Sequence, residues 1–138
     1  MEYIDKFKTV EEIEECAKYY IKLLGLQDWR ILFVLGKTKD ENNAGECESI
    51  FEEKCARIVI SDIDYEDLWF KQPQELILIH ELIHCKIELY ENSNMTLESL
   101  MIYQQRHTLI DDWARSIFYC RYGLTHKDFY YGRDEHKT

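Results

Sequence analysis

The pattern of apolar positions predicts a first helix over residues 9–24. Apolar side chains recur there every three or four positions, as expected when one face of a helix is buried. Thr9 and Glu12 fit a capping box, in which the Thr9 hydroxyl accepts a hydrogen bond from the Glu12 amide and the Glu12 side chain bonds back. Gly25 is a natural end, because glycine readily adopts the left-handed conformation of a helix terminus. The predicted buried face consists of Val10, Ile13, Ala17, Tyr20 and Leu24.

Three short strands are predicted in the middle of the chain. Residues 29–35 form an apolar run that ends at Gly36 and indicates a buried strand. Beyond a polar loop at 37–45, residues 46–52 could form a polar, exposed strand. In residues 54–61 apolar and polar positions alternate, as in a strand with one buried face. Turn-forming residues lie on both sides of the second strand, so we expect a small antiparallel sheet.

Two further helices are predicted in the second half of the chain. Pro73 stands where a helix tolerates proline best, in the first turn, and residues 73–90 are apolar over much of the helix circumference. Such a helix belongs in the interior. A polar turn separates it from a long helix over residues 95–122 that stops at a glycine, and the tail at 126–138 fits no element. This order of elements predicts an α+β fold with a single domain over residues 1–138.

Composition and charge narrow the range of partners. The chain has 138 residues, of which 46% are hydrophobic, and this is enough for one buried core. Its 17 basic and 27 acidic residues give a net charge of −10, which repels phosphate backbones, so we expect no nucleic-acid partner. No apolar run approaches the roughly 18 residues of a membrane span, and no signal peptide is visible, so we expect no membrane association. The five cysteines have irregular spacings and no CxxC pair, which favours reduced thiols in a cytoplasmic protein.

The second predicted helix contains the sequence HELIH, an HExxH motif. His80 and His84 are four residues apart, so both imidazoles lie on one helix face and can bind one metal ion. Glu81 lies about 100° around the helix from His80, beside the ion rather than on it. From there its carboxylate can take a proton from a water molecule that the metal activates, as the general base of a hydrolysis.

A catalytic zinc site needs a third protein ligand. The long helix offers His107 and Glu98, which are nine residues apart and therefore about 180° apart around the helix, so they cannot face the same site. We expect His107 to be the ligand, because its face of the helix carries a mostly apolar, inward stripe. Asp111, one turn beyond, could accept a hydrogen bond from a ligand imidazole and fix its tautomer.

These residues resemble those of the compact, minigluzincin-like zincin metallopeptidases, which are common in phages, prophages and other mobile elements. That family combines HExxH with a glutamate on the next helix, followed at fixed offsets by small, polar and aromatic residues. His107 stands at the position of that glutamate, and the offset positions are occupied by Ile110, Asp111, Trp113 and Ala114. The resemblance implies a minimal zincin-like fold over residues 9–122, with a three-histidine site.

The resemblance also implies a zinc-dependent metallopeptidase. One Zn²⁺ per chain would be bound by His80, His84 and His107, with Glu81 as general base. The substrate would be a peptide or protein whose extended backbone pairs with an edge strand, for which the strand around 46–51 or the one at 54–61 could serve. Peptide hydrolysis also needs a hydrogen-bond donor for the developing oxyanion. Side chains of a suitable type are Tyr103, His126, Tyr130 and Tyr131.

Three other functions fit parts of the sequence. A catalytically silent zincin-like module would keep zinc for stability and act as a regulatory or interaction protein, although a purely structural site has no use for Glu81. A metal-free helical interaction protein would carry the histidines by coincidence. A metal hydrolase could instead cleave another amide or an ester. A small protease also needs restraint, which a narrow cleft, a regulatory partner or an occluding C-terminal tail could supply.

Overall fold

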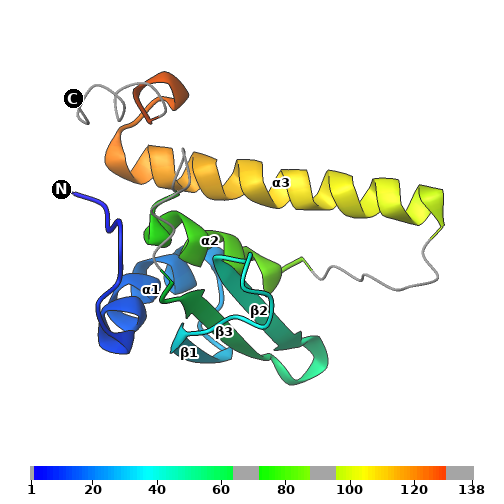
Figure 1. The fold of residues 1–138 in the computed structure, drawn as a ribbon, viewed down its shortest axis with the longest axis horizontal. Coiled ribbons are helices and arrows are strands. Elements are labelled where there is room, and N and C mark those ends of the chain that lie inside the picture. The colour runs from blue at the N-terminus through cyan, green and yellow to red at the C-terminus, as the bar shows by residue number, and fades with distance from the viewer. Residues whose placement is uncertain (1, 64–71, 88–95, 130–138) are drawn as a thin grey trace.

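The computed structural model describes residues 2–63, 72–87 and 96–129. Along the chain lie α1 (Val10–Leu24), β1 (Arg30–Gly36), β2 (Gly45–Ile50), a 3₁₀ turn (Phe51–Glu53), β3 (Cys55–Ser61), α2 (Gln74–His84) and α3 (Leu97–Tyr122). Helices combined with a small three-stranded sheet and a long C-terminal helix confirm the predicted α+β class. In Figure 1, α2 lies between the sheet and α3, and the first turns of α3 extend beyond the rest of the described chain.

The first helix has the predicted caps. The Thr9 hydroxyl accepts a hydrogen bond of 3.2 Å from the Glu12 amide, and Gly25 ends α1 with a left-handed φ of 69°. The Glu12 carboxylate, however, accepts from the amide of Lys8 rather than from that of Thr9. The hydrogen bond from the backbone back to the Glu12 side chain therefore comes from the residue before the expected one.

The later helices differ from their predicted bounds. α2 ends at His84, and residues 85–87 are no longer helical, so the predicted end at residue 90 is wrong. α3 begins at Leu97, and the predicted turn between the two helices lies outside the described residues. Among the described helices, none has the length and apolar character needed to cross a membrane.

The sheet is mixed, not antiparallel as expected. Its strand order is β1-β3-β2, with β3 parallel to β1 and antiparallel to β2. Val59 and Ser61 of β3, which alternation predicts on an exposed face, are each 1% exposed. A strand buried on both faces needs neighbours on both edges for its backbone groups, so β3 lies in the centre. β2 is consequently an edge strand. Of the two strands considered as the edge for a substrate, the one at 54–61 is therefore excluded.

The core surrounds α2. This helix contacts α1, β2, β3 and α3, and its side chains Leu78, Ile79, Leu82 and Ile83 are fully buried. A helix that is apolar over most of its circumference is stable only in such a position. The core also includes Phe129, whose ring packs on Phe118 with centroids 5.7 Å apart, so the unassigned tail begins as part of the packed structure.

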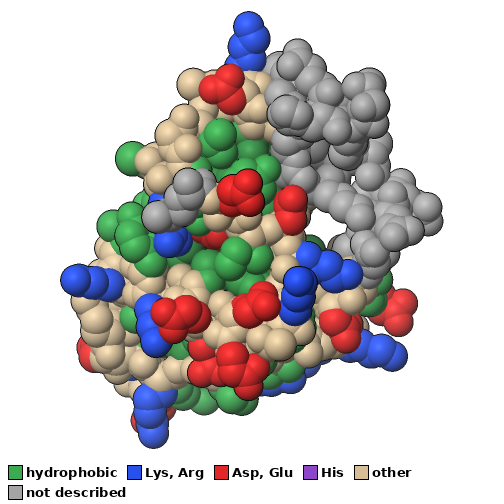
Figure 2. All heavy atoms as spheres, turned by 90° about the vertical axis from the view of Figure 1, so that its left-hand side faces the viewer, with side chains coloured by type: hydrophobic (Ala, Val, Ile, Leu, Met, Phe, Trp, Pro, Cys, Tyr) green, Lys and Arg blue, Asp and Glu red, His purple; other side chains and the backbone are tan. Residues whose placement is uncertain are grey.

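Charged side chains are mixed on the surface. Figure 2 shows the face at the left of Figure 1, where acidic and basic side chains surround hydrophobic ones. Exposed pairs include Lys18 with Glu15 and Lys54 with Asp28. Such pairs each contribute little to stability because water screens them.

A buried carboxylate connects the N-terminal segment with three helices. Glu75 of α2 is fully buried and accepts hydrogen bonds from the amide of Ile4, the hydroxyls of Tyr20 and Tyr122 and the guanidinium of Arg121. Burial, followed by the hydrogen bond to Glu75, raises the pKa of both tyrosines and keeps them as donors. Since Arg121 and Tyr122 end α3, this cluster fixes α3 against α2.

We expect Glu75→Gln to lower the free energy of unfolding by about 2–3 kcal/mol, because removing one partner of a buried ion pair leaves the other charge without compensation. Urea unfolding followed by circular dichroism measures the change. Glu14→Gln, at an exposed position of α1, should shift stability by no more than about 0.5 kcal/mol. Equal unfolding midpoints for Glu75→Gln and wild type would contradict the role of this cluster.

Candidate metal centre

α2 places two imidazoles side by side. His80 and His84 lie one helical turn apart, with their Nε2 atoms separated by 3.1 Å and their ring centroids by 4.9 Å. The intervening Leu82 and Ile83 are buried in the core, so the turn that carries the motif is held by packing. The HExxH spacing on a buried helix therefore presents both rings to the same point.

α3 brings a third imidazole to this point. One ligand atom from each of His80, His84 and His107 lies within 4.8 Å of the others. The ring centroid of His107 is 5.2 Å from that of His80 and 6.3 Å from that of His84. Ligand nitrogens around tetrahedral zinc, with bonds of about 2.0–2.1 Å, are separated by about 3.3 Å, so small side-chain rotations suffice. Three imidazole nitrogens with one open side fit Zn²⁺ in number and in chemistry.

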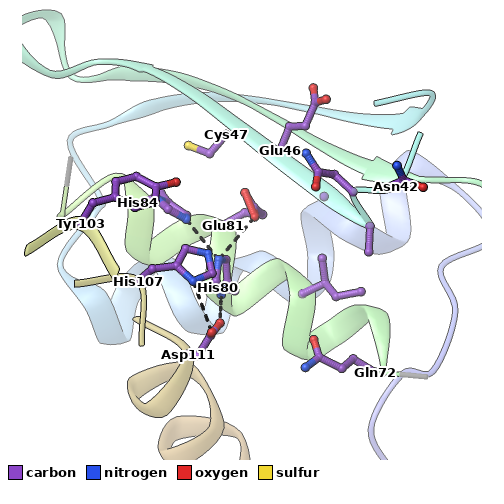
Figure 3. A pocket seen from close by; sticks show the side chains of 14 residues that line it. Asn42, Glu46, Cys47, Gln72, His80, Glu81, His84, Tyr103, His107 and Asp111 are labelled. Carbon is purple, nitrogen blue, oxygen red and sulfur yellow. Dashed lines mark hydrogen bonds and ion pairs between the residues drawn. The ribbon is translucent and has the colours of Figure 1, made fainter. Parts of the chain in front are cut away.

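Asp111 orients two of the three rings. Its carboxylate oxygens lie 2.7 Å from Nδ1 of His80 and 3.5 Å from Nδ1 of His107 (Figure 3). A proton on His80 Nδ1 that is donated to Asp111 leaves the lone pair of the neutral ring on Nε2, which faces His84. The sequence predicts a bond from a ligand imidazole to Asp111, and in the structure the nearer ring belongs to the other helix.

The surroundings shift the pKa values of His80 and His84 in opposite directions and lower that of Asp111. Burial, followed by the charges of His80 and His107, lowers the pKa of His84 to about 4, so this ring is neutral at pH 7. Burial also acts to lower the pKa of His80, but the hydrogen bond to Asp111 and the nearby Glu81 outweigh it and raise that pKa. For Asp111, burial opposes ionisation, yet the bond from His80 lowers the pKa overall. Asp111 is therefore an ionised acceptor for the His80 ring.

Glu81 lies beside the three nitrogens, as the helical angle predicts. Its Oε1 is 3.8 Å from Nε2 of His80, and the residue is 6% exposed. Burial raises the pKa of Glu81 to about 7, against the opposing influence of His80. The Glu81 carboxylate thus lies next to the three histidines but is not part of the group that could hold an ion.

A cleft of about 490 Å³ extends from the histidines along the edge strand. Residues 42–47 line one side of it, and Gln72 and Tyr103 also contribute (Figure 3). The thiol of Cys47 on β2 is hydrogen-bonded to that of Cys85, and this bond, followed by burial, raises the pKa of Cys47. The contact packs β2 against the end of α2, next to the three histidines. None of the five cysteines, all within the described residues, forms a disulfide.

The alternative third ligand lies away from the centre. Glu98 is exposed in the first turn of α3, nine residues before His107, which corresponds to about 13 Å along the helix axis. Among the described residues, the group that could hold an ion consists of histidines only. The structure thus brings His107, and not Glu98, to the HExxH motif.

The oxyanion-donor candidates are distributed over both ends of α3. Tyr103 lines the cleft and stacks on His107, with ring centroids 6.3 Å apart and planes inclined by 21°. His126 instead lies 3.1 Å from the hydroxyl of Tyr119, near the opposite end of the helix. Tyr130 and Tyr131 lie outside the described residues. Tyr103 is the described candidate at the cleft, and its role as donor stays a prediction.

The sequence pattern does not predict that the start of β2 lines the cleft. Gly45 reads as a turn residue, but a glycine at the beginning of a strand also signals that another element approaches closely. No comparable signal exists for the contact between Cys47 and Cys85, which depends on how the edge strand lies against α2.

Comparisons of the chain with protein-family models, with curated proteins and with solved structures found no match. Inferences about this site therefore rest on its own residues, and the zincin resemblance stays a prediction.

We expect Asp111→Asn to weaken Zn²⁺ binding by about 10–100-fold, because hydrogen-bond partners of ligand imidazoles contribute affinity of this size. Competition with a chromophoric chelator measures the dissociation constant. Asp112→Asn is the matched control, since Asp112 points to Arg115 at 2.5 Å and is not a partner of the rings. Unchanged zinc affinity in Asp111→Asn would show that the Asp111 contacts do not support metal binding.

Proposed function

We propose that the chain is a zinc-dependent metallopeptidase. The observation that carries this proposal is the convergence of His80, His84 and His107 beside a buried Glu81, at one end of a cleft that follows an edge strand. A structural zinc site is normally closed by four protein ligands, whereas a catalytic site keeps a position open. Only three ligand side chains converge among the described residues, which supports the catalytic type.

The residues present fit zinc and its chemistry. His80, His84 and His107 would hold the ion, with Asp111 fixing the His80 tautomer. When bound, Zn²⁺ supplies Lewis acidity that polarises the scissile carbonyl and makes water a stronger acid.

The location of the protein in the cytoplasm stays a prediction.

Glu81 is the candidate general base. Its Oε1 lies 3.8 Å from His80 Nε2, so the carboxylate can accept a proton from a water molecule at the histidine cluster. The same oxygen can then deliver the proton to the departing amine nitrogen. Burial at 6% exposure restricts other water molecules from this carboxylate, which favours a defined proton path.

The edge strand offers a place for an extended substrate. The amide of Ser61 donates to the carbonyl of Ala44, so in the antiparallel pattern the backbone groups of Gly45 and Cys47 point to the open edge of β2. A peptide added there would satisfy these groups and lie along the cleft. Tyr103, on the α3 side of the cleft, is the proposed donor to the oxyanion.

We expect one zinc per chain in the zinc-reconstituted protein and in Glu81→Gln and Glu98→Ala, and loss of zinc in His107→Ala. Glu81→Gln should lose at least about 100-fold in hydrolysis of a quenched-fluorescent peptide library, because a general base contributes a factor of this order. Elemental analysis and fluorescence measure the two quantities.

The outcomes separate the alternatives. Zinc binding without hydrolysis of any peptide or ester probe would identify a catalytically silent zinc module. Cleavage of esters alone would identify a different hydrolase. Full activity of Glu81→Gln would contradict the proposed base, and the absence of zinc from metal-replete wild type would contradict both the peptidase and the zinc module.

A further inference from the structure

Gly45 is required by space and not by backbone conformation. The glycines with positive φ among the described residues are Gly25 and Gly123, so any L-residue could adopt the backbone of Gly45. A Cβ atom at this position would nevertheless lie 2.7 Å from Cγ2 of Ile77, 3.2 Å from Cγ of Glu81 and 3.4 Å from the carbonyl oxygen of Val59. Real Cβ contacts are essentially never as close as the first distance, so the β2 backbone lies directly on the α2 side chains.

The contacts follow one side of α2 and the residue that caps it. Ile77 and Glu81 are four residues apart and therefore lie on one side of the helix. Cys85, four residues further, directly follows the last turn and keeps a right-handed backbone conformation, so it continues this row. Gly45 lies against the first two of them, and Cys47, two residues further along β2, lies against Cys85. The edge strand therefore runs beside this row, and the Glu81 stem lies between the strand backbone and the histidine cluster.

Of the three groups around Gly45, the Val59 carbonyl and the Ile77 side chain have little freedom to move. The start of β2 is held to β3 by the hydrogen bond of 2.9 Å from the Ser61 amide to the Ala44 carbonyl. Cγ2 of Ile77 branches from Cβ, and a β-branched side chain in a helix has one strongly preferred rotamer. The Glu81 stem is the unbranched, movable partner, so an added methyl group at Gly45 would displace this side chain.

We propose that Gly45 is a positioning residue for Glu81. The missing side chain at position 45 lets the β2 backbone support the Glu81 stem and hold the carboxylate beside the three imidazoles. The catalytic consequence rests on the proposed peptidase function, but the positional consequence does not. A purely structural glycine would affect stability without a specific effect on Glu81.

The test uses the zinc-loaded full chain as wild type, Gly45→Ala, Ile77→Leu and the double variant. Ile77→Leu removes the branch at Cβ, and with it the closest contact, while conserving side-chain volume; the contact with Glu81 stays. Gly36→Ala is the matched control, because a Cβ there would meet only Val34 Cγ1 at an ordinary 3.7 Å. Urea unfolding reports stability, and the ¹³C resonance of the Glu81 carboxyl group, assigned by its absence in Glu81→Gln, reports position.

We expect Gly45→Ala to lower the unfolding midpoint and Ile77→Leu to restore most of that loss in the double variant. The Glu81 resonance should be displaced in Gly45→Ala and stay displaced in the double variant, with wild-type positions in Gly36→Ala and Ile77→Leu. On a cleaved peptide, kcat should fall about 10–100-fold in both Gly45→Ala variants, with KM within about twofold, because misplacement of a reacting group affects the chemical step.

Two results would overturn the proposal. One is a wild-type Glu81 resonance in the folded Gly45→Ala or double variant, and the other is recovery of kcat together with stability when Ile77→Leu is added. If Gly45→Ala does not fold, the double variant alone gives the decisive resonance. If wild type cleaves no peptide, the proposed function fails, and the resonance still decides whether Gly45 positions Glu81.

Discussion

The burial of α2 over most of its circumference is the constraint on which the remaining structure depends. Leu78, Ile79, Leu82 and Ile83 remove apolar surface from water against the sheet, α1 and α3, and the polar residues of the helix must then be satisfied inside the protein. Glu75 is satisfied by tyrosines and an arginine, and His80 by Asp111. The same packing that holds the helix therefore fixes the rings that it carries.

The local signals in the sequence are sufficient for the first helix and for part of the site. Thr9 and Gly25 mark the ends of α1, and the four-residue spacing of His80 and His84 places both rings on one face. The helical angle between His107 and Glu98 excludes a shared site, and the structure brings His107 to the motif. The caps, the spacing of His80 and His84 and the angle between His107 and Glu98 depend on residues within a few turns of one another, where helix geometry alone decides position.

The features that were missed depend on contacts between distant elements. Alternation in β3 suggests one exposed face, but the packing of other elements buries Val59 and Ser61 and moves the strand to the centre of a mixed sheet. Which strand forms the edge follows from that choice, and so do the approach of Gly45 to Glu81 and the contact of Cys47 with Cys85. Asp111 could be placed near an imidazole from sequence, but its bond to His80 requires the relative position of two helices.

α3 is attached at two levels, by Asp111 at the histidine cluster and by Arg121 and Tyr122 at Glu75. Ten residues separate Asp111 from Arg121, so the helix makes about 2.8 turns over about 15 Å between its attachments. Inserting or deleting one residue there would rotate His107 by about 100° relative to the Glu75 cluster. Even a change from 3.6 to the 3.5 residues per turn of a coiled coil would rotate it by almost 30° over these ten residues. The two attachments therefore fix the length of this segment of α3, whereas they place no such restriction on the turns before Tyr103.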